Sequence, residues 1–353
     1  MSEGRIARGE LTDEQWERLS PHLPTGYHTK RKKLKRRPGR PWKDHRTVVN
    51  GILWVLRTGA PWADLPERYG PHQTCWWRFA RWKQDGTWDR ILAALQSQAE
   101  DRGEIEWSNT ALDGSYIRAH QHSAGARRPE EKVAAGAEEK VATGTEEKVA
   151  AGAEEKKGRY EAGDGGVERP ERVESTPETQ TEEAALTSRR AAEALGRSRG
   201  GLTTKINLMC EGQGKPLTFK ITPGNLHDST TMEAVLDDVS VKSSGRGRPR
   251  KRPDSANLDK GYSYKKCRAA LRRRGISAMV PERKDQRENR KKKGRKGGRP
   301  AKYDGERYAK RNVVERCLCR LKGWRRIATR YDKRAAHFEA FVTLACILIW
   351  LGA

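Results

Sequence analysis

Apolar residues recur along the chain at two spacings, which predict a helical N-terminal part and a later part of alternating strands and helices. In residues 44–57, DHRTVVNGILWVLR, apolar positions 48, 49, 52, 53, 55 and 56 form one buried helical stripe. The segment LTDEQWERL predicts an earlier helix that Thr12 or Asp13 caps. The apolar run from Phe338 to Leu351 is shorter than the about 20 residues of a membrane-spanning helix. It therefore predicts a buried C-terminal helix and no membrane partner.

Aromatic and basic residues are interleaved in a third predicted helix, QTCWWRFARWKQDG. Its tryptophans and phenylalanine stand beside Arg78 and Arg81, an arrangement that resembles a small helix-turn-helix module. We therefore expect residues 1–100 to form an all-helical DNA-binding domain in which Arg78 and Arg81 contact DNA. The alternative is an aromatic-cored bundle with a solvated basic face. A basic linker broken by proline and glycine, TKRKKLKRRPGRPW, spans residues 29–42.

From residue 107 onward the pattern changes to strands alternating with helices. The predicted strands are NTALDGSYIRAH with Asp113 inside it, the hairpin 202–210 and 216–224, the strand 255–262 that ends at Asp259, and 276–282. The helices between them are HDSTTMEAVLDDV, with Asp228 and Ser229 as caps, and YKKCRAALRRRG, closed by Gly275. This order predicts an α/β domain, residues 107–122 with 195–353, built on a mixed sheet with flanking helices.

Residues 123–194 interrupt that domain with a different composition. An eight-residue repeat, EEKVAAGA, recurs from residue 130, and residues 130–186 hold 16 acidic and 8 basic side chains. Such a segment, poor in aromatic residues, cannot offset its ordering entropy, so we expect a disordered acidic insertion. The chain carries +26 and this segment −8, so the remainder carries +34.

This excess of basic residues makes an anionic polymer the expected partner. Charge alone would also suit a basic ribosome-like or membrane-surface protein. The six cysteines are scattered without a zinc-ligand spacing, which favours structural thiols in a reducing cytosol. No signal peptide opens the sequence, and we expect a cytoplasmic protein.

Four polar residues in YAKRNVVERCLCRLK suggest where chemistry takes place. On one helix at 100° per residue, Tyr308, Arg311, Glu315 and Lys322 fall within a stripe of about 60°, opposite an apolar face. The stripe presents a carboxylate between two cations, with a phenol beside it. A solvated, salt-bridged face would give the same pattern.

Two aspartates add to this carboxylate. Asp113 in ALDGSY and Asp259 in ANLDKGY both follow apolar residues and lie close to a glycine. Each alone is more often a turn former, but with Glu315 they supply three carboxylates of the kind that binds Mg²⁺. Such a trio supports two-metal phosphoryl transfer with two Mg²⁺ ions, for which Mn²⁺ substitutes. Arg311 and Lys322 would then hold phosphates, and Tyr308 would contact sugar or phosphate.

At these residues the chain resembles the DDE transposases of bacterial insertion sequences, in the IS-four/IS-five group. The spacing Tyr308, two residues, Arg311, three residues, Glu315, six residues, Lys322 is similar to that group's signature around its catalytic glutamate. The segments LDGSYIRAHQHSAGARR, LGRSRGGLTTKINL, TPGNLHDS, LDKGYSY and the N-terminal LTDEQWERL also look like this family. The likeness covers nearly the whole chain except residues 129–190.

The resemblance implies an RNase H-like fold in which Asp113, Asp259 and Glu315 form the catalytic, metal-binding triad. It also implies accessory DNA contacts by Tyr308, Arg311 and Lys322. The expected function is a nucleoid-associated transposase that binds inverted-repeat ends and target DNA, cuts and joins them, and acts as a homodimer on DNA. Rival readings are a catalytically silent DNA-binding regulator derived from a transposase, and a nuclease that hydrolyses without joining. Three histidines also stand near these elements. We expect them to contact DNA or to cap helices rather than to bind metal: His120, His122 and His227.

Overall fold

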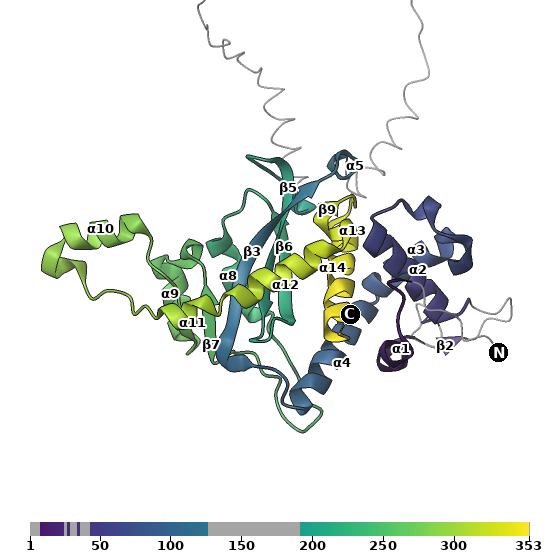
Figure 1. Ribbon diagram of the computed structural model, residues 1–353, viewed down its shortest axis with the longest axis horizontal. Coiled ribbons are helices and arrows are strands. Elements are labelled where there is room, and N and C mark those ends of the chain that lie inside the picture. Colours follow the sequence, from purple (N-terminus) through teal and green to yellow (C-terminus); the bar gives the residue numbers. More distant parts are fainter. Residues whose placement is uncertain (1–7, 25–26, 29–33, 36–42, 126–190, 353) are drawn as a thin grey trace, which may run out of the picture. The chain divides into compact units, whose positions relative to one another are not determined.

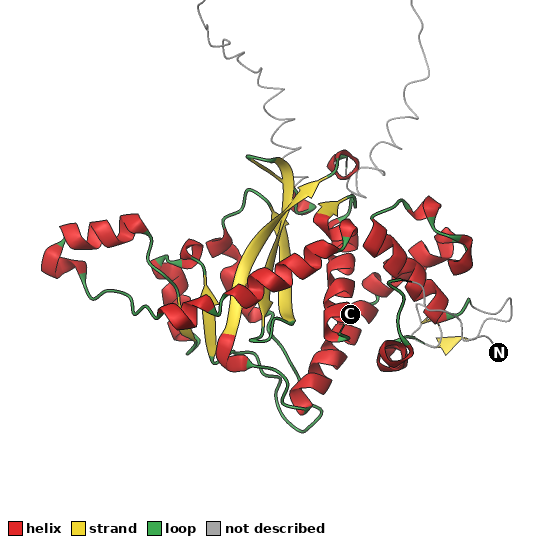
Figure 2. Ribbon diagram, in the orientation of Figure 1, coloured by secondary structure: helices red, strands yellow, loops and turns green. Residues whose placement is uncertain are grey.

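The computed structural model describes residues 8–24, 27–28, 34–35, 43–125 and 191–352. Most of the predicted basic linker and residues 126–190 of the predicted insertion lie outside these ranges. The described parts before residue 126 and after residue 190 belong to one compact unit. Figures 1 and 2 show their helices and strands.

The N-terminal part is helical, apart from a two-residue antiparallel ladder between β1 (Tyr27–His28) and β2 (Leu34–Lys35). Its helices are α1 (Asp13–Leu19), α2 (His45–Thr58), α3 (His72–Gln84) and α4 (Thr87–Asp101). Thr12 caps α1 in a capping box, as one of the two predicted candidates. Asp44 caps α2, and Gly59 ends it in the left-handed conformation with φ 71°. The apolar stripe predicted for α2 is buried, which confirms the helical reading.

A seven-stranded mixed sheet follows, as the alternating pattern predicts. Its long strands are β3 (Thr110–Ala119), β5 (Gly201–Cys210) and β6 (Pro216–Pro223), which pair antiparallel. The short strands β7 (Ser255–Leu258) and β8 (Ser277–Met279) extend the sheet in parallel beyond β3. Two further short strands, β4 (Gly196–Ser198) and β9 (Thr329–Arg330), pair with β5 and β3.

Helices cover both faces of this sheet. Arg311, at the start of α12 (Asn312–Gly323), contacts Asp113 of β3, whereas Asp228 of α8 (Asp228–Asp237) lies against Gly114. Since successive strand residues face opposite sides, α12 and α8 lie on opposite faces. The N-cap of α8 is His227, whose Nδ1 accepts from the Ser229 backbone, so the predicted caps Asp228 and Ser229 are wrong by one to two residues. Further helices are α5 (Gln121–Ala124), α9 (Lys265–Arg273), α10 (Lys284–Lys292), α11 (Gly305–Ala309) and α13 (Arg325–Ala328).

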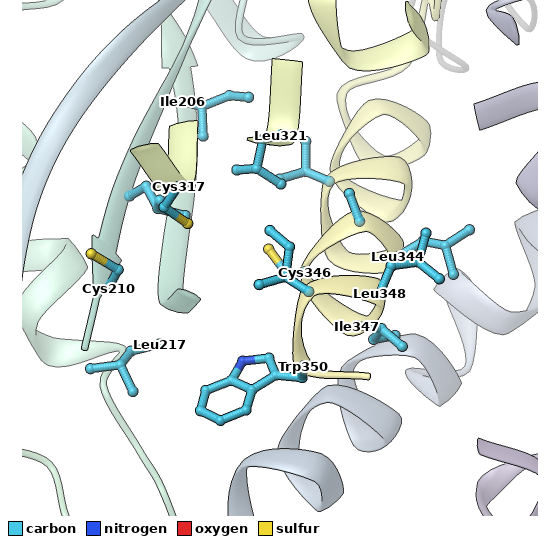
Figure 3. Packing of buried hydrophobic residues seen from close by; sticks show 14 of the residues in the cluster. Ile206, Cys210, Leu217, Cys317, Leu321, Leu344, Cys346, Ile347, Leu348 and Trp350 are labelled. Carbon is cyan, nitrogen blue, oxygen red and sulfur yellow. The ribbon is translucent and has the colours of Figure 1, made fainter. Parts of the chain in front are cut away.

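The C-terminal helix α14 (Ala335–Trp350) is buried along most of its length, as its apolar run predicts. It contacts β6 on one side and α3 and α4 on another. Phe341 stacks on Phe79 of α3 at 4.3 Å between ring centroids, and the Trp350 indole donates to the Pro216 carbonyl. Figure 3 shows Cys317 and Leu321 of α12 in the same apolar layer as α14. In the part of the chain that the structure describes, no helix is long and apolar enough to cross a membrane.

Candidate active site

The sheet brings Asp113 and Asp259 to neighbouring strands. Strands β3 and β7 run parallel, and Leu112 pairs with Leu258, so the two aspartates are the next residues on each strand. Strand β7 ends there, whereas β3 continues past Asp113. Adjacent strands lie about 4.8 Å apart, so this register places the two carboxylates at one position of the sheet.

Arg311 joins the first aspartate to the glutamate. Its Nη1 lies 2.7 Å from Oδ2 of Asp113, and its Nη2 contacts Oε1 of Glu315. Glu315 stands in the first turn of α12, so its carboxylate also lies near the positive end of the helix dipole. One guanidinium therefore ties a strand acid to a helix acid.

The helix around Arg311 differs from the predicted one. Helix α11 ends at Ala309, residues 310 and 311 form a turn, and α12 begins at Asn312. The prediction of one continuous helix from Tyr308 to Lys322 is therefore wrong. The Tyr308 ring still lies 5.7 Å from the Arg311 guanidinium, whereas Lys322 is exposed about two turns beyond Glu315.

Burial and neighbouring acids change the pKa of two groups at this site. Burial raises the pKa of Asp113, and the charge of Asp259 raises it further, against the lowering effects of the Gly114 backbone N–H and Arg311. Burial also raises the pKa of Tyr262 well above its usual value, as do Asp228, Asp113 and Asp259 in turn. Burial is thus the main cause of both shifts, and the neighbouring carboxylates add to it.

A second polar pair lies on the other face of β3. The Lys205 ammonium, on β5, lies 2.8 Å from Oδ1 of Asp228 and donates to the Leu226 carbonyl. A Cβ added at Gly114 would lie 2.7 Å from that same Oδ1. The sequence reading missed this pair; a single lysine within LTTKINLMC was the only signal of it.

The two predicted arginines of α3 are placed differently. Arg78 is 5% exposed, and its guanidinium donates to Nδ1 of His45, so it does not present its charge to a DNA backbone. Arg81 is partly exposed, forms an ion pair with Asp85 at 3.7 Å and lies near the Trp77 ring. We therefore drop Arg78 from the proposed DNA contacts because of its burial and keep Arg81.

The three histidines considered above make local contacts. His120 Nδ1 accepts from the His122 backbone, and its ring lies 4.9 Å from that of Tyr331. His227 caps α8 and packs edge-on against Tyr264 at 5.4 Å. In the described ranges, no three His, Cys, Asp or Glu side chains form a ready metal-binding group.

Oxygen donors of the kind that hold a hard cation are nevertheless present. Asp113 and Asp259 share one position of the sheet, and Glu315 is linked to Asp113 through Arg311. Burial, with a smaller contribution from the charge of Asp259, raises the pKa of Asp113 against the lowering effect of Arg311. A divalent cation with oxygen ligands therefore fits the donor set, provided that Arg311 releases Glu315.

Two family models match the chain. One is described as a putative transposase of the IS4/5 family and matches residues 11–92, and the other is a transposase DDE domain matching residues 175–350. No solved structure matches the chain.

The chain is also similar to proteins of two bacteria, and those of Burkholderia cepacia come from the insertion element IS402. The chain is 38% identical over 118 residues to an uncharacterised protein of Sinorhizobium fredii, covering 33% of this chain and 83% of that protein. It is 35% identical over 116 residues, 32% of this chain, to an uncharacterised protein of insertion element IS402 from Burkholderia cepacia, covering 76% of it. It is 31% identical over 153 residues to a putative transposase for IS402 of the same organism, covering 43% of this chain and 64% of that relative. The chain therefore belongs to the IS4/5 family of insertion-sequence transposases with a DDE domain.

Proposed function

We propose that this transposase binds the inverted-repeat ends of its element, cuts there by metal-dependent hydrolysis and joins the freed ends to target DNA. The observation that carries this proposal is the register that places Asp113 beside Asp259, with Glu315 tied to Asp113 by Arg311. Acids gathered from two strands and a helix serve no packing purpose, and their repulsion costs stability.

Asp113, Asp259 and Glu315 are the residues that would hold two Mg²⁺ ions or, in their place, Mn²⁺. When bound, the metal activates the attacking water or 3′-hydroxyl and stabilises charge on the leaving oxygen. Arg311 holds Asp113 and Glu315 together in the protein alone, which limits repulsion between the acids. Tyr308, Arg311 and Lys322 then offer contacts to sugar and phosphate along one side of the site.

The remaining parts of the proposal concern the whole assembly. We assign end recognition to residues 1–100, with Arg81 among the contacts, and catalysis to an RNase H-like domain of residues 107–122 and 195–353. Two ends must be processed together, so we expect a homodimer on DNA. The protein would act at the nucleoid in the cytoplasm.

A cleavage assay on the element's own terminal DNA with added Mg²⁺ tests the chemistry. Replacing a residue that only supports the metal's ligands typically lowers activity by about 10- to 100-fold. Asp259→Asn should lower the rate of cleavage by more than this, while binding to the DNA ends persists. Asp237→Asn is the matched control, because Asp237 is an exposed acid at the end of α8 that pairs with Arg274 at 2.8 Å. Full cleavage by Asp259→Asn would refute the assigned site.

The same assay separates the rival functions. A parent protein that binds ends but never cuts them, with any divalent metal, would instead be a silent regulator. Pre-cut ends incubated with a plasmid should yield joined products. Cutting without joining would identify a nuclease.

A further inference from the structure

A strongly basic segment leaves the sheet beside the candidate active site. We call residues 284–299 the basic arm; it comprises α10, Lys293, a 3₁₀ turn at Gly294–Gly297 and the two residues after it. The arm follows β8, which runs parallel to β7. The carboxyl ends of parallel strands meet at one edge of a sheet, so the arm begins on the side where Asp259 follows β7. Figure 1 shows α10 extending away from the strands.

The basic arm has no apolar anchor of its own. Helix α10 buries none of its residues. The arm holds nine lysines and arginines and two acids, a net charge of +7 over 16 residues. A helix that is polar all round gains nothing from apolar burial, and its like charges repel.

Contacts at the root fix the direction in which the arm leaves the sheet. Arg290 pairs with Glu282 at 2.9 Å, and both side chains are mostly buried. Arg283, just before the arm, lies 4.9 Å above the Tyr264 ring and donates to its hydroxyl. Of the arm's own cations, these contacts use Arg290 alone, which reaches back from α10 to Glu282.

The remaining cations are left in solvent. Within the described residues, seven arm cations are exposed and make no ion pair: Arg287, Lys291, Lys292, Lys293, Arg295, Lys296 and Arg299. A cluster of this sign and density is complementary to the phosphates of duplex DNA, which carries one charge per about 1.7 Å of axis.

We infer that the basic arm binds the phosphate backbone of double-stranded DNA without reading its sequence, and holds that DNA on the Asp259 side of the sheet. The inference rests on the DNA-binding part of the proposed function. Nine helical residues span about 14 Å, the length of about four phosphates along one strand. The arm therefore reaches about three or four phosphates at once.

Salt dependence of binding measures these contacts directly. The arm variant carries glutamine at positions 291, 292, 293, 295 and 296. The control variant carries Arg199→Gln, Lys242→Gln, Lys266→Gln, Arg272→Gln and Lys333→Gln, which remove the same charge from exposed sites outside both the basic arm and residues 1–100. Binding of the full chain to a labelled duplex without terminal repeats is followed by fluorescence anisotropy, with chelator present, from about 50 to 300 mM salt.

Each lost phosphate contact reduces the slope of log K against log salt by about 0.9. The arm variant should therefore lose about 3 units of slope, and the control variant less than about 1. An unchanged slope in the arm variant, or an equal loss in the control, would overturn the inference. A larger arm-dependent slope on an RNA duplex than on DNA would overturn it as well.

Failure of the proposed function gives a different result. A parent protein that binds no DNA at any salt contradicts DNA binding as a whole. Loss of the arm effect alone leaves Mg²⁺-dependent cleavage of the terminal DNA intact.

Discussion

Two lysines on adjacent strands form ion pairs of nearly the same length but of different burial. Comparing them measures how burial changes the contribution of an ion pair to the free energy of unfolding. Lys205 of β5 lies 2.8 Å from Asp228, and its side chain is 2% exposed against 28% for the aspartate. Lys220 of β6 lies 2.7 Å from Asp238, with side chains 34% and 44% exposed. The ion-pair distances are almost equal, so the pairs differ in burial and in the contacts that Lys205 also makes with the Leu226 carbonyl and the Tyr116 ring.

We expect Lys205→Met to destabilise the protein far more than Lys220→Met. Breaking a buried ion pair costs about 3–5 kcal/mol, because the remaining charge is left without a partner in a poorly hydrated place. Asp228 keeps some access to water, which lowers the expected cost to about 2–3 kcal/mol. The exposed pair is worth about 0–1 kcal/mol, because water and salt screen it.

Urea unfolding at neutral pH measures both costs. With a slope of about 2–3 kcal/mol per molar urea, Lys205→Met should lower the midpoint by about 1 M, and Lys220→Met should leave it nearly unchanged. Adding Asp228→Asn to Lys205→Met should recover part of the loss, because the unpaired charge is removed. Equal costs for the two lysine variants would refute the reasoning.

Two further predictions concern close contacts at named atoms. Gly114→Ala should lower the free energy of unfolding by about 1–3 kcal/mol, measured in urea, because the new methyl group would press on the Asp228 carboxylate. The same variant should weaken any Mg²⁺-dependent cleavage. An unchanged urea midpoint would show that the Asp228 side chain moves aside. Burial, followed by the charge of Arg78, lowers the pKa of His45, whose Nδ1 faces that guanidinium while Nε2 faces the Pro24 carbonyl. The unfolded chain therefore binds more protons near pH 6, so stability should fall as pH drops below about 6.5, and His45→Gln should flatten this part of the curve. An equally steep curve in that variant would assign the pH dependence to other groups.

Local pattern predicted the elements that carry the aspartates. Strand β3 and the short strand before Asp259 each begin with an apolar run, and turn residues lie beside them. The structure contains both strands. The sequence alone could not give their parallel pairing, because register depends on contacts between residues far apart in the chain. It is this pairing that brings Asp113 beside Asp259.

Tertiary contacts explain where the sequence reading failed. Tyr308 and Arg311 fall on the same helical stripe as Glu315 and Lys322, so the spacing of these polar residues predicted one helix. In the structure Asp304 caps a short α11, and Arg311 turns toward Asp113 at the start of a new helix. Arg78 reads as a surface cation between tryptophans, yet it is buried against His45 of α2. Asp113 and His45, the partners of these two arginines, both lie far from them in the sequence.

The charge balance across β3 explains why these acids suit a divalent cation. Asp113 and Gly114 are successive residues that face opposite sides, so one strand serves Arg311 on one face and the Lys205–Asp228 pair on the other. Lys205 neutralises Asp228, which leaves Arg311 as the single cation shared by two acids, with Asp259 alongside. The three acids Asp113, Asp259 and Glu315 and the one guanidinium of Arg311 together carry a formal charge of −2. A first divalent cation would balance this charge once Arg311 releases Glu315, while the buried Lys205–Asp228 pair on the other face stays intact.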